Sequence, residues 1–111
     1  MNQVQLVGRL VRDPELRYTK NGRALCFITV AVDGYYDKQK KDTVADFIPV
    51  QLWGKTAEQV AKGVKKGTLV SIVGRISSGS YEKNGSKVYV LDIIGEEVKF
   101  LARPFGKAKG E

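Results

Sequence analysis

Residues 46–55 (DFIPVQLWGK) combine the alternation of a β-strand with large apolar side chains on both of its faces. Successive side chains of a strand point to opposite faces. One face carries three aliphatic residues typical of a core: Ile48, Val50 and Leu52. The other face carries Phe47, Gln51 and Trp53, while Pro49 implies an edge position or a bulge. We therefore expect a β-sheet protein in which this strand has a second, aromatic face.

Two further strands are expected before this segment. The first has a core face made of four residues: Val4, Leu6, Gly8 and Leu10. It ends at Asp13-Pro14, and 18–22 is expected to be a turn. In the second, 25–32, both alternating sets are apolar, which predicts a central strand covered on both sides. Residues 34–45 are polar and are expected to form a loop.

One helix and a hairpin are expected after this segment. The helix has Thr56 and Gln59 as a capping box and Gly67 as its C-cap. Its apolar face has helical spacing: Ala57, Val60, Ala61 and Val64. A strand over 69–77 follows, and then a hairpin over 80–90. Asn84-Gly85 suits a type I′ turn, which sets Glu82 opposite Lys87. The last strand is expected to run on towards Leu101.

The expected order is three strands, a helix and two strands. This order predicts an all-β protein with one short helix: the OB-fold, a five-stranded Greek-key barrel. An SH3-like barrel is the alternative, but it would not need the helix. We expect one domain over 1–103, followed by a short basic tail over 104–111. Four basic residues lie in this tail and just before it: Lys99, Arg103, Lys107 and Lys109.

Composition favours a polyanion as partner and argues against catalysis. Lys and Arg total 19 against 12 acidic residues, which gives a net charge of +7. Such an excess is typical of nucleic-acid binding, although it also serves solubility. The chain has no histidine and a single cysteine, Cys26, expected to be a buried apolar side chain. We therefore expect no enzyme, no metal and no cofactor. The lone cysteine suits a reducing cytoplasm, and no apolar run is long enough for a membrane.

Aromatic and basic residues occur together in the candidate binding segments. Base stacking is insensitive to sequence and needs exposed rings. The candidate stacking residues are Tyr35, Tyr36, Phe47, Trp53 and Tyr81. The candidate phosphate contacts are Lys38, Lys40, Lys41, Lys55 and Lys66. Phe47 and Trp53 could instead belong to a second core layer or a subunit interface. Tyr81 could instead be a cross-strand partner in its hairpin, and the lysines could belong to an ordinary solvated surface.

The chain resembles the bacterial-type single-stranded DNA-binding proteins. The N-terminal pattern VGRL…DPELRY…NG is specific to that family. The segments that carry the resemblance are 2–10, 13–18, 21–22, 27–32, 52–58, 66–70 and 74–76. The resemblance implies an OB-fold homotetramer that binds unpaired DNA without sequence preference and without catalysis. It also implies stacking by Tyr35 or Tyr36, Phe47, Trp53 and Tyr81, with Lys38, Lys55 and Lys66 near the DNA backbone.

Three features depart from the family pattern. Residues 77–80 (SSGS) replace a basic run before Tyr81, and Pro49 replaces a polar or basic residue. Family members also continue through a flexible linker to an acidic tip that recruits repair and replication enzymes. This chain ends GKAKGE, so we expect no recruitment through such a tip.

Two other functions remain as alternatives. The first is an OB-fold interaction module of a primosome-type assembly, with weak DNA binding and a strong protein partner. The second is a barrel-fold nuclease, which would need clustered carboxylates for a metal ion. The sequence shows no such cluster.

Overall fold

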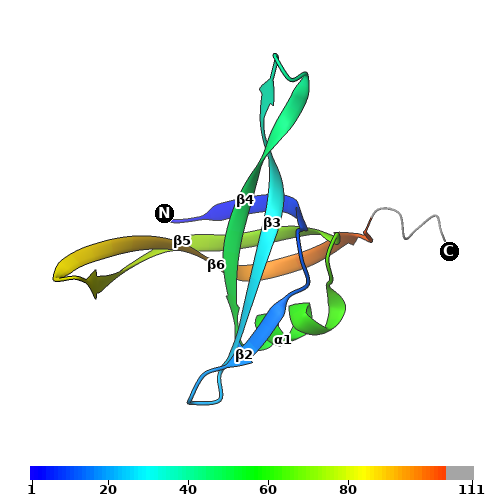
Figure 1. Cartoon of the computed structure of the whole chain (residues 1–111). Helices are drawn as coiled ribbons and strands as arrows, with labels where there is room; N and C mark the ends of the chain where they lie inside the picture. The colour runs from blue at the N-terminus through cyan, green and yellow to red at the C-terminus, as the bar shows by residue number, and fades with distance from the viewer. Residues whose placement is uncertain (105–111) are drawn as a thin grey trace.

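The computed structural model describes residues 1–104 of the chain (Figure 1). In this part of the chain, the elements follow in the order β1 (Val4–Leu10), β2 (Glu15–Tyr18), β3 (Ala24–Asp37), β4 (Asp42–Trp53), α1 (Gly54–Gly63), β5 (Leu69–Lys83) and β6 (Ser86–Ala102). The tail expected over 104–111 lies outside the described residues except for Pro104, and so do Lys107 and Lys109. The proposed domain boundary therefore stays a prediction.

Five strands close into a barrel. The sheet order is β1-β5-β6-β4-β3-β2, and a further pairing of β1 with β3 closes the ring. The parallel pair is β4 with β6, and the other ladders are antiparallel. This topology, with α1 between the third and fourth barrel strands, is the OB-fold that the sequence predicts. The remaining strand, β2, pairs with β3 outside the ring.

The barrel interior is filled by the expected alternating positions. The buried hydrophobic residues of the strands are Leu10, Ala24, Cys26, Ile28, Val30, Val50, Leu52, Val70 and Ile72. Gly8 is needed where β1 meets β3, since a Cβ there would collide with the backbone of Ala31. Burial of Cys26 confirms its predicted role as a small apolar core residue.

The helix has the predicted apolar face but different ends. Ala57 and Val60 are buried. The helix begins at Gly54, so Trp53 is the N-cap, and no side-chain cap bond forms. The predicted capping box is therefore wrong, because the positive φ of Gly54 turns the chain into the helix directly after β4. The helix ends at Gly63 rather than near Gly67, whose N–H instead donates to the Leu10 carbonyl. Within residues 1–104, no helix has the length and apolarity needed to cross a membrane.

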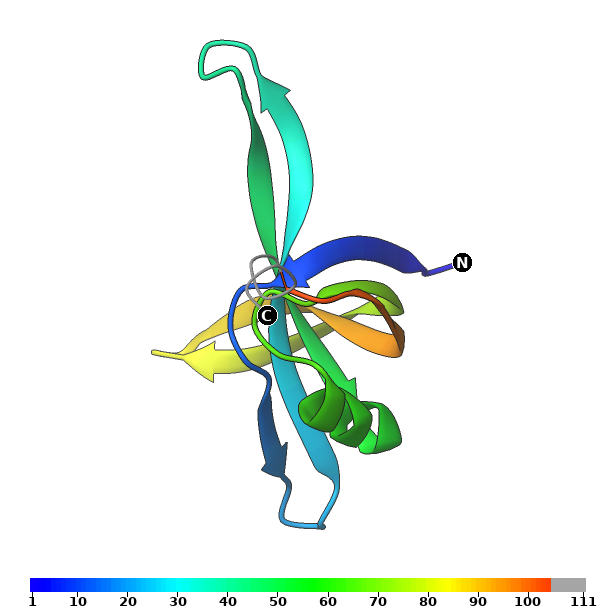
Figure 2. The same cartoon turned by 90° about the vertical axis from the view of Figure 1, so that its right-hand side faces the viewer.

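Two hairpin arms leave the barrel in different directions (Figures 1 and 2). The β3–β4 arm replaces the loop predicted over 34–45, since the pairing continues to Asp37 opposite Asp42. The β5–β6 arm has the predicted turn, with φ of 52° at Asn84 and 80° at Gly85. Its register sets Glu82 opposite Lys87, which is also as predicted. The strand predicted to end at 77 continues to Lys83.

The second face of β3 was predicted incorrectly. The strand is central, with β4 on one side and β1 and β2 on the other. Its outer face is nevertheless not covered by the described chain, since Phe27 is 36% exposed. The strand β2, which lies beside this face, was missed because its four residues, ELRY, are all exposed and follow no core pattern.

Candidate nucleic-acid interface

The outer face of β4 presents the two predicted aromatic residues. Phe47 is 65% exposed and lies opposite Ala31, while Trp53 is half-buried and lies opposite Leu25. Val50 and Leu52, on the inner face, are buried, so the predicted alternation is confirmed. Because β4 rises by about 3.3 Å per residue, the two rings lie about 20 Å apart along the strand. Because its side chain is mostly exposed, Phe47 is not part of a second core layer within the described residues.

Pro49 lies at an edge, as its missing N–H predicts. It is opposite Thr29 on β3, and the pairing of β4 with β6 begins only at Val50. On the β6 side, β4 is therefore an edge strand at Pro49. The register shift in the β3–β4 ladder lies elsewhere, between Asp33 and Tyr36.

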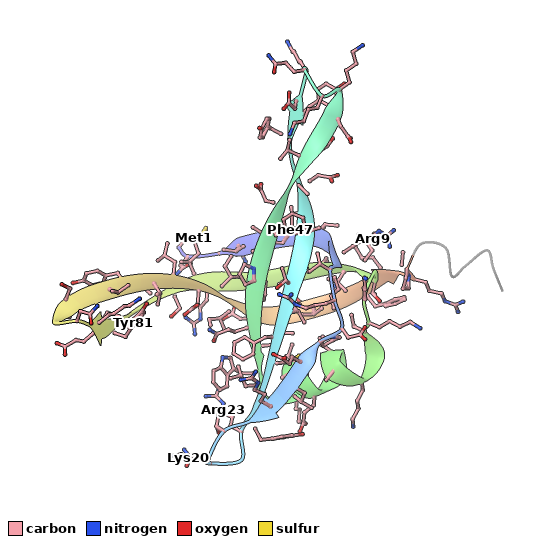
Figure 3. All side chains as sticks on the ribbon, viewed as in Figure 1. Met1, Arg9, Lys20, Arg23, Phe47 and Tyr81 are labelled. Carbon is pink, nitrogen blue, oxygen red and sulfur yellow. The ribbon has the colours of Figure 1, made fainter. Side chains whose placement is uncertain are left out.

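A guanidinium covers one face of the Trp53 ring. The Arg23 side chain lies over it, with Cζ 4.5 Å from the ring centroid. Arg23 precedes β3, at the β2–β3 turn (Figure 3). A cation this close is attracted by the ring's negative face. The contact depends on the pairing of β3 with β4, so sequence reasoning did not find Arg23.

Two more arginines lie against the outer face of β3. Arg17 on β2 is over the Phe27 ring, with Cζ 5.9 Å from the centroid. Arg12 donates a hydrogen bond to the Thr29 hydroxyl at 3.1 Å. Phe27 and Thr29 occupy outward positions, between buried residues of the strand. This outward position of Phe27 was readable from the alternation, but the ring was interpreted as part of a covered face.

Tyr35 and Tyr36 lie on the β3–β4 arm. Both tyrosines are exposed, on the outer part of β3, near the register shift. The turn beyond them carries three exposed lysines: Lys38, Lys40 and Lys41. The Asp37 carboxylate holds this turn by accepting hydrogen bonds from the backbone N–H groups of Gln39 and Lys40. The arm thus brings two rings and three cations together.

The remaining candidates are not gathered into the same patch. Lys55 is exposed in the first turn of α1, two residues after Trp53. Lys66 is exposed in the loop before β5, and its backbone N–H donates to Asp13. Tyr81 is exposed on the β5–β6 arm, opposite Val88 (Figure 3). The candidates therefore occupy the two arms and the barrel surface between them.

Residues 77–80 lie on the same arm as Tyr81. The alternation of β5 places Ser78 and Ser80 on the face opposite to Tyr81. On that face they are opposite Leu91 and Tyr89, which are both exposed. The serines that replace the basic run thus share a face with two large exposed side chains.

Two titratable groups, Cys26 in the core and Tyr18 on β2, have a raised pKa and stay neutral at neutral pH. Burial raises the pKa of the Cys26 thiol, an effect that its hydrogen bond to the Glu15 backbone partly offsets. Desolvation and then the Glu58 carboxylate raise the pKa of Tyr18. The Tyr18 hydroxyl donates to Glu58 at 3.3 Å and joins β2 to α1. Neither group therefore adds a negative charge beside the arginines at neutral pH.

Comparison with known proteins gives one consistent family. Residues 1–101 match the family model described as "Single-strand binding protein family". A single-stranded DNA-binding protein of Halalkalibacterium halodurans is 45% identical over 111 residues, covering 99% of this chain and 66% of that protein. "Single-stranded DNA-binding protein 2" of Clostridium acetobutylicum is 48% identical over 103 residues, covering 91% and 77%.

A third relative has the same name as the first. The single-stranded DNA-binding protein of Bacillus cereus is 46% identical over 102 residues, covering 91% of this chain and 60% of that protein. The chain thus spans between 60% and 77% of the length of these three relatives. With the family match extending over both arms and the whole barrel, the chain belongs to the single-strand binding protein family.

Proposed function

We propose that this chain binds single-stranded DNA without sequence preference and without catalysis. The observation that carries the proposal is the outward aromatic face of β4, with exposed Phe47 and half-buried Trp53, on an OB barrel of net charge +7. The names of the relatives support the same ligand. The protein would coat and protect unpaired DNA during replication, recombination or repair, in the cytoplasm at the nucleoid.

Stacking and phosphate contacts would both contribute to the affinity. Each base stacked on an aromatic side chain contributes about 1–3 kcal/mol, as measured by alanine substitution. The rings of Phe47 and Trp53, with Tyr35, Tyr36 and Tyr81 on the arms, would supply these stacks. Lysines at the turn of the β3–β4 arm, with Lys55 and Lys66, would neutralise phosphates.

Tryptophan fluorescence tests the proposal, because Trp53 is the only tryptophan. We expect oligothymidine to quench its emission strongly and duplex DNA of equal length to quench it weakly, since a duplex presents no free base face. The DNA should also be recovered intact after incubation with Mg²⁺, which a nuclease would not allow. Equal quenching by duplex would contradict the stacking interface.

The lysines of the β3–β4 turn should account for part of the salt dependence of the affinity for single-stranded DNA. Each phosphate neutralised on a single strand contributes about −0.7 to the slope of log K against log salt. We expect the triple change of Lys38, Lys40 and Lys41 to alanine to flatten the slope by up to about 2, since three contacts are lost. Lys62→Ala, on the last turn of α1, is the control for lost charge. An unchanged slope in the triple variant would remove this turn from the DNA path.

We also propose that the protein assembles as a homotetramer. Residues 4–8 of β1 have a free edge, because the pairing with β3 begins only at Arg9. Their outer face carries Gln5 and the exposed Val7. A free strand edge is a template for pairing with another chain.

Light scattering at micromolar concentration tests this assembly. We expect a mass about four times the chain mass of 12.3 kDa. Val7→Arg should lower that mass, because it places a charge in the middle of the proposed contact. A monomer mass for the unchanged protein would contradict the proposal.

A further inference from the structure

The outer face of the sheet continues from β4 onto β3 and β2. Phe27 lies in the centre of this face, opposite Gln51 on β4 and Glu15 on β2. One step along β3, Leu25 is opposite Trp53 and Arg17. Paired residues of neighbouring strands share a face, so Phe27 and Trp53 lie on the same side of the sheet, one diagonal step apart.

The Phe27 ring is open to a ligand from two sides. It is 36% exposed, although it lies in the middle of three strands. A hollow on its β2 side is lined by Arg12, Pro14 and Thr29, together with the carboxylates described next. A second, more apolar hollow on the β4 side is lined by Pro49 and Gln51 and continues to Leu91 on the β5–β6 arm. A flat group can therefore approach the ring in the described chain.

Three guanidinium groups lie along the same face. They belong to Arg12, Arg17 and Arg23, which contact Thr29, Phe27 and Trp53 respectively. A guanidinium is planar, so it can stack on a ring and also donate to phosphate oxygens. Such a set, beside exposed rings, has the chemistry that an unpaired nucleic-acid strand requires.

The two carboxylates near this face do not cancel its charge. Asp13 accepts a hydrogen bond from the backbone N–H of Lys66 at 2.8 Å and is held there. Glu15 pairs with Arg17 at 3.3 Å, but both side chains are well exposed. An exposed pair of this kind is weak, so a phosphate can take over the Arg17 guanidinium.

We propose that this face is a further part of the DNA path, in which a base stacks on Phe27 while Arg12, Arg17 and Arg23 contact the neighbouring phosphates. The inference rests on the proposed single-stranded DNA binding and extends the path from Trp53 across β3. It assigns Phe27 a role that sequence reasoning did not give it. It also assigns phosphate contact to arginines on β2 and in its flanking segments, in addition to the lysines of the arm.

The charge of the face favours DNA over a second copy of the chain as its occupant. A two-fold contact uses the same patch on both subunits. Each subunit would then bring the same three arginines into the contact, and like charges brought together cost free energy. A DNA strand presents the opposite charge along its whole length.

A fluorescence reporter at position 27 gives the direct test. In the double variant Phe27→Trp/Trp53→Phe, position 27 holds the only tryptophan, and an aromatic ring remains at position 53. We expect oligothymidine to quench its emission and duplex DNA to leave it nearly unchanged. One result would overturn this inference and leave the proposed function standing. In that result, oligothymidine quenches Trp53 of the wild type, and the double variant binds labelled oligothymidine without a change in its emission. If the wild type does not bind at all, both fail.

Affinity measurements give a second, independent test. Phe27→Ala should raise Kd for labelled oligothymidine by about 5- to 150-fold, the range that one lost base stack gives. Arg17→Ala should flatten the salt slope by about 0.7, whereas Arg17→Lys should keep the slope. Lys62→Ala is the control for the loss of one positive charge. It should change Kd and the salt slope much less than the Phe27 and Arg17 variants do.

Two outcomes of these measurements would overturn the inference. The first is wild-type affinity in the folded Phe27→Ala variant, as checked by circular dichroism. The second is a lower light-scattering mass for that variant. A lower mass would mean that Phe27 lies in a contact between copies of the chain. Weakened binding at unchanged mass supports the path across β3.

Discussion

The double variant Phe47→Ala/Trp53→Ala binds oligothymidine about 2–6 kcal/mol more weakly than the unchanged protein, if each lost stack contributes about 1–3 kcal/mol. The two losses should add, because the rings lie about 20 Å apart on β4 and distant sites act independently. Each single variant should then show about half of the loss. Anisotropy of a labelled oligothymidine is the measurement, since the double variant has no tryptophan.

The fold should survive this change, which keeps the result interpretable. Phe47 is 65% exposed, so its removal leaves no cavity in the core. Trp53 is half-buried, and its removal leaves Arg23 without the ring it covers. Circular dichroism and a thermal melt will show whether the barrel remains.

Tyr89→Ala is a matched control for this variant. Tyr89 is an exposed aromatic residue on β6, and it points to the opposite face of its arm from Tyr81. Its removal should leave the affinity within error of the wild type. Normal binding by both β4 single variants would assign those rings to contact between copies instead.

The sequence predicts the aromatic face of β4 because that face depends on local alternation alone. Buried Val50 and Leu52 fix the phase of the strand, and Phe47 and Trp53 must then point outward. The turn at Asn84-Gly85 is also local, since it follows from the positive φ that these two residues tolerate. The OB topology follows from the order of such local elements.

The β3–β4 arm was missed because its strands have no core to bury. The ladder from the Asp33–Ala45 pair to the Asp37–Asp42 pair contains no buried residue, so hydrophobic alternation does not mark it. A register shift in the arm also breaks the period that strand prediction uses. Tyr35 and Tyr36 were consequently assigned to a loop rather than to a strand.

The contacts of Arg23 and Arg17 were missed for a different reason. Each arginine reaches its ring across a strand pair: Arg23 reaches Trp53 on β4, and Arg17 reaches Phe27 on β3. The Arg23 contact needs the register of β3 with β4, whereas the Arg17 contact needs β2, a strand whose exposed residues follow no core pattern. The sequence supplied the rings and the charges, but their juxtaposition is a tertiary property.

Gly74→Ala should destabilise the fold by about 1–3 kcal/mol or more, as overpacking of a closely packed interior does. Gly74 lies opposite Gly95 at the register shift where β5 leaves the barrel towards its arm. A Cβ at Gly74 would collide with the carbonyl oxygen of Ile94 and would lie 3.1 Å from the Cα of Gly95. Both obstacles are backbone atoms, so they can move only if the β5–β6 ladder opens.

Gly79→Ala on the same strand is the matched control. Its Cβ would meet only a Val90 methyl group, at 3.8 Å, and no positive φ is required at Gly79. Since glycine in a strand interior is less favourable than alanine by about 0.5–1 kcal/mol, this variant should be as stable as the wild type or slightly more stable. Urea unfolding followed by Trp53 emission compares the two. Equal urea midpoints for the Gly74 and Gly79 variants would mean that the close approach of β5 and β6 at Gly74 does not affect the stability of the fold. Unfolding of only the Gly74 variant would show that this close approach of β5 and β6 requires a residue without a side chain.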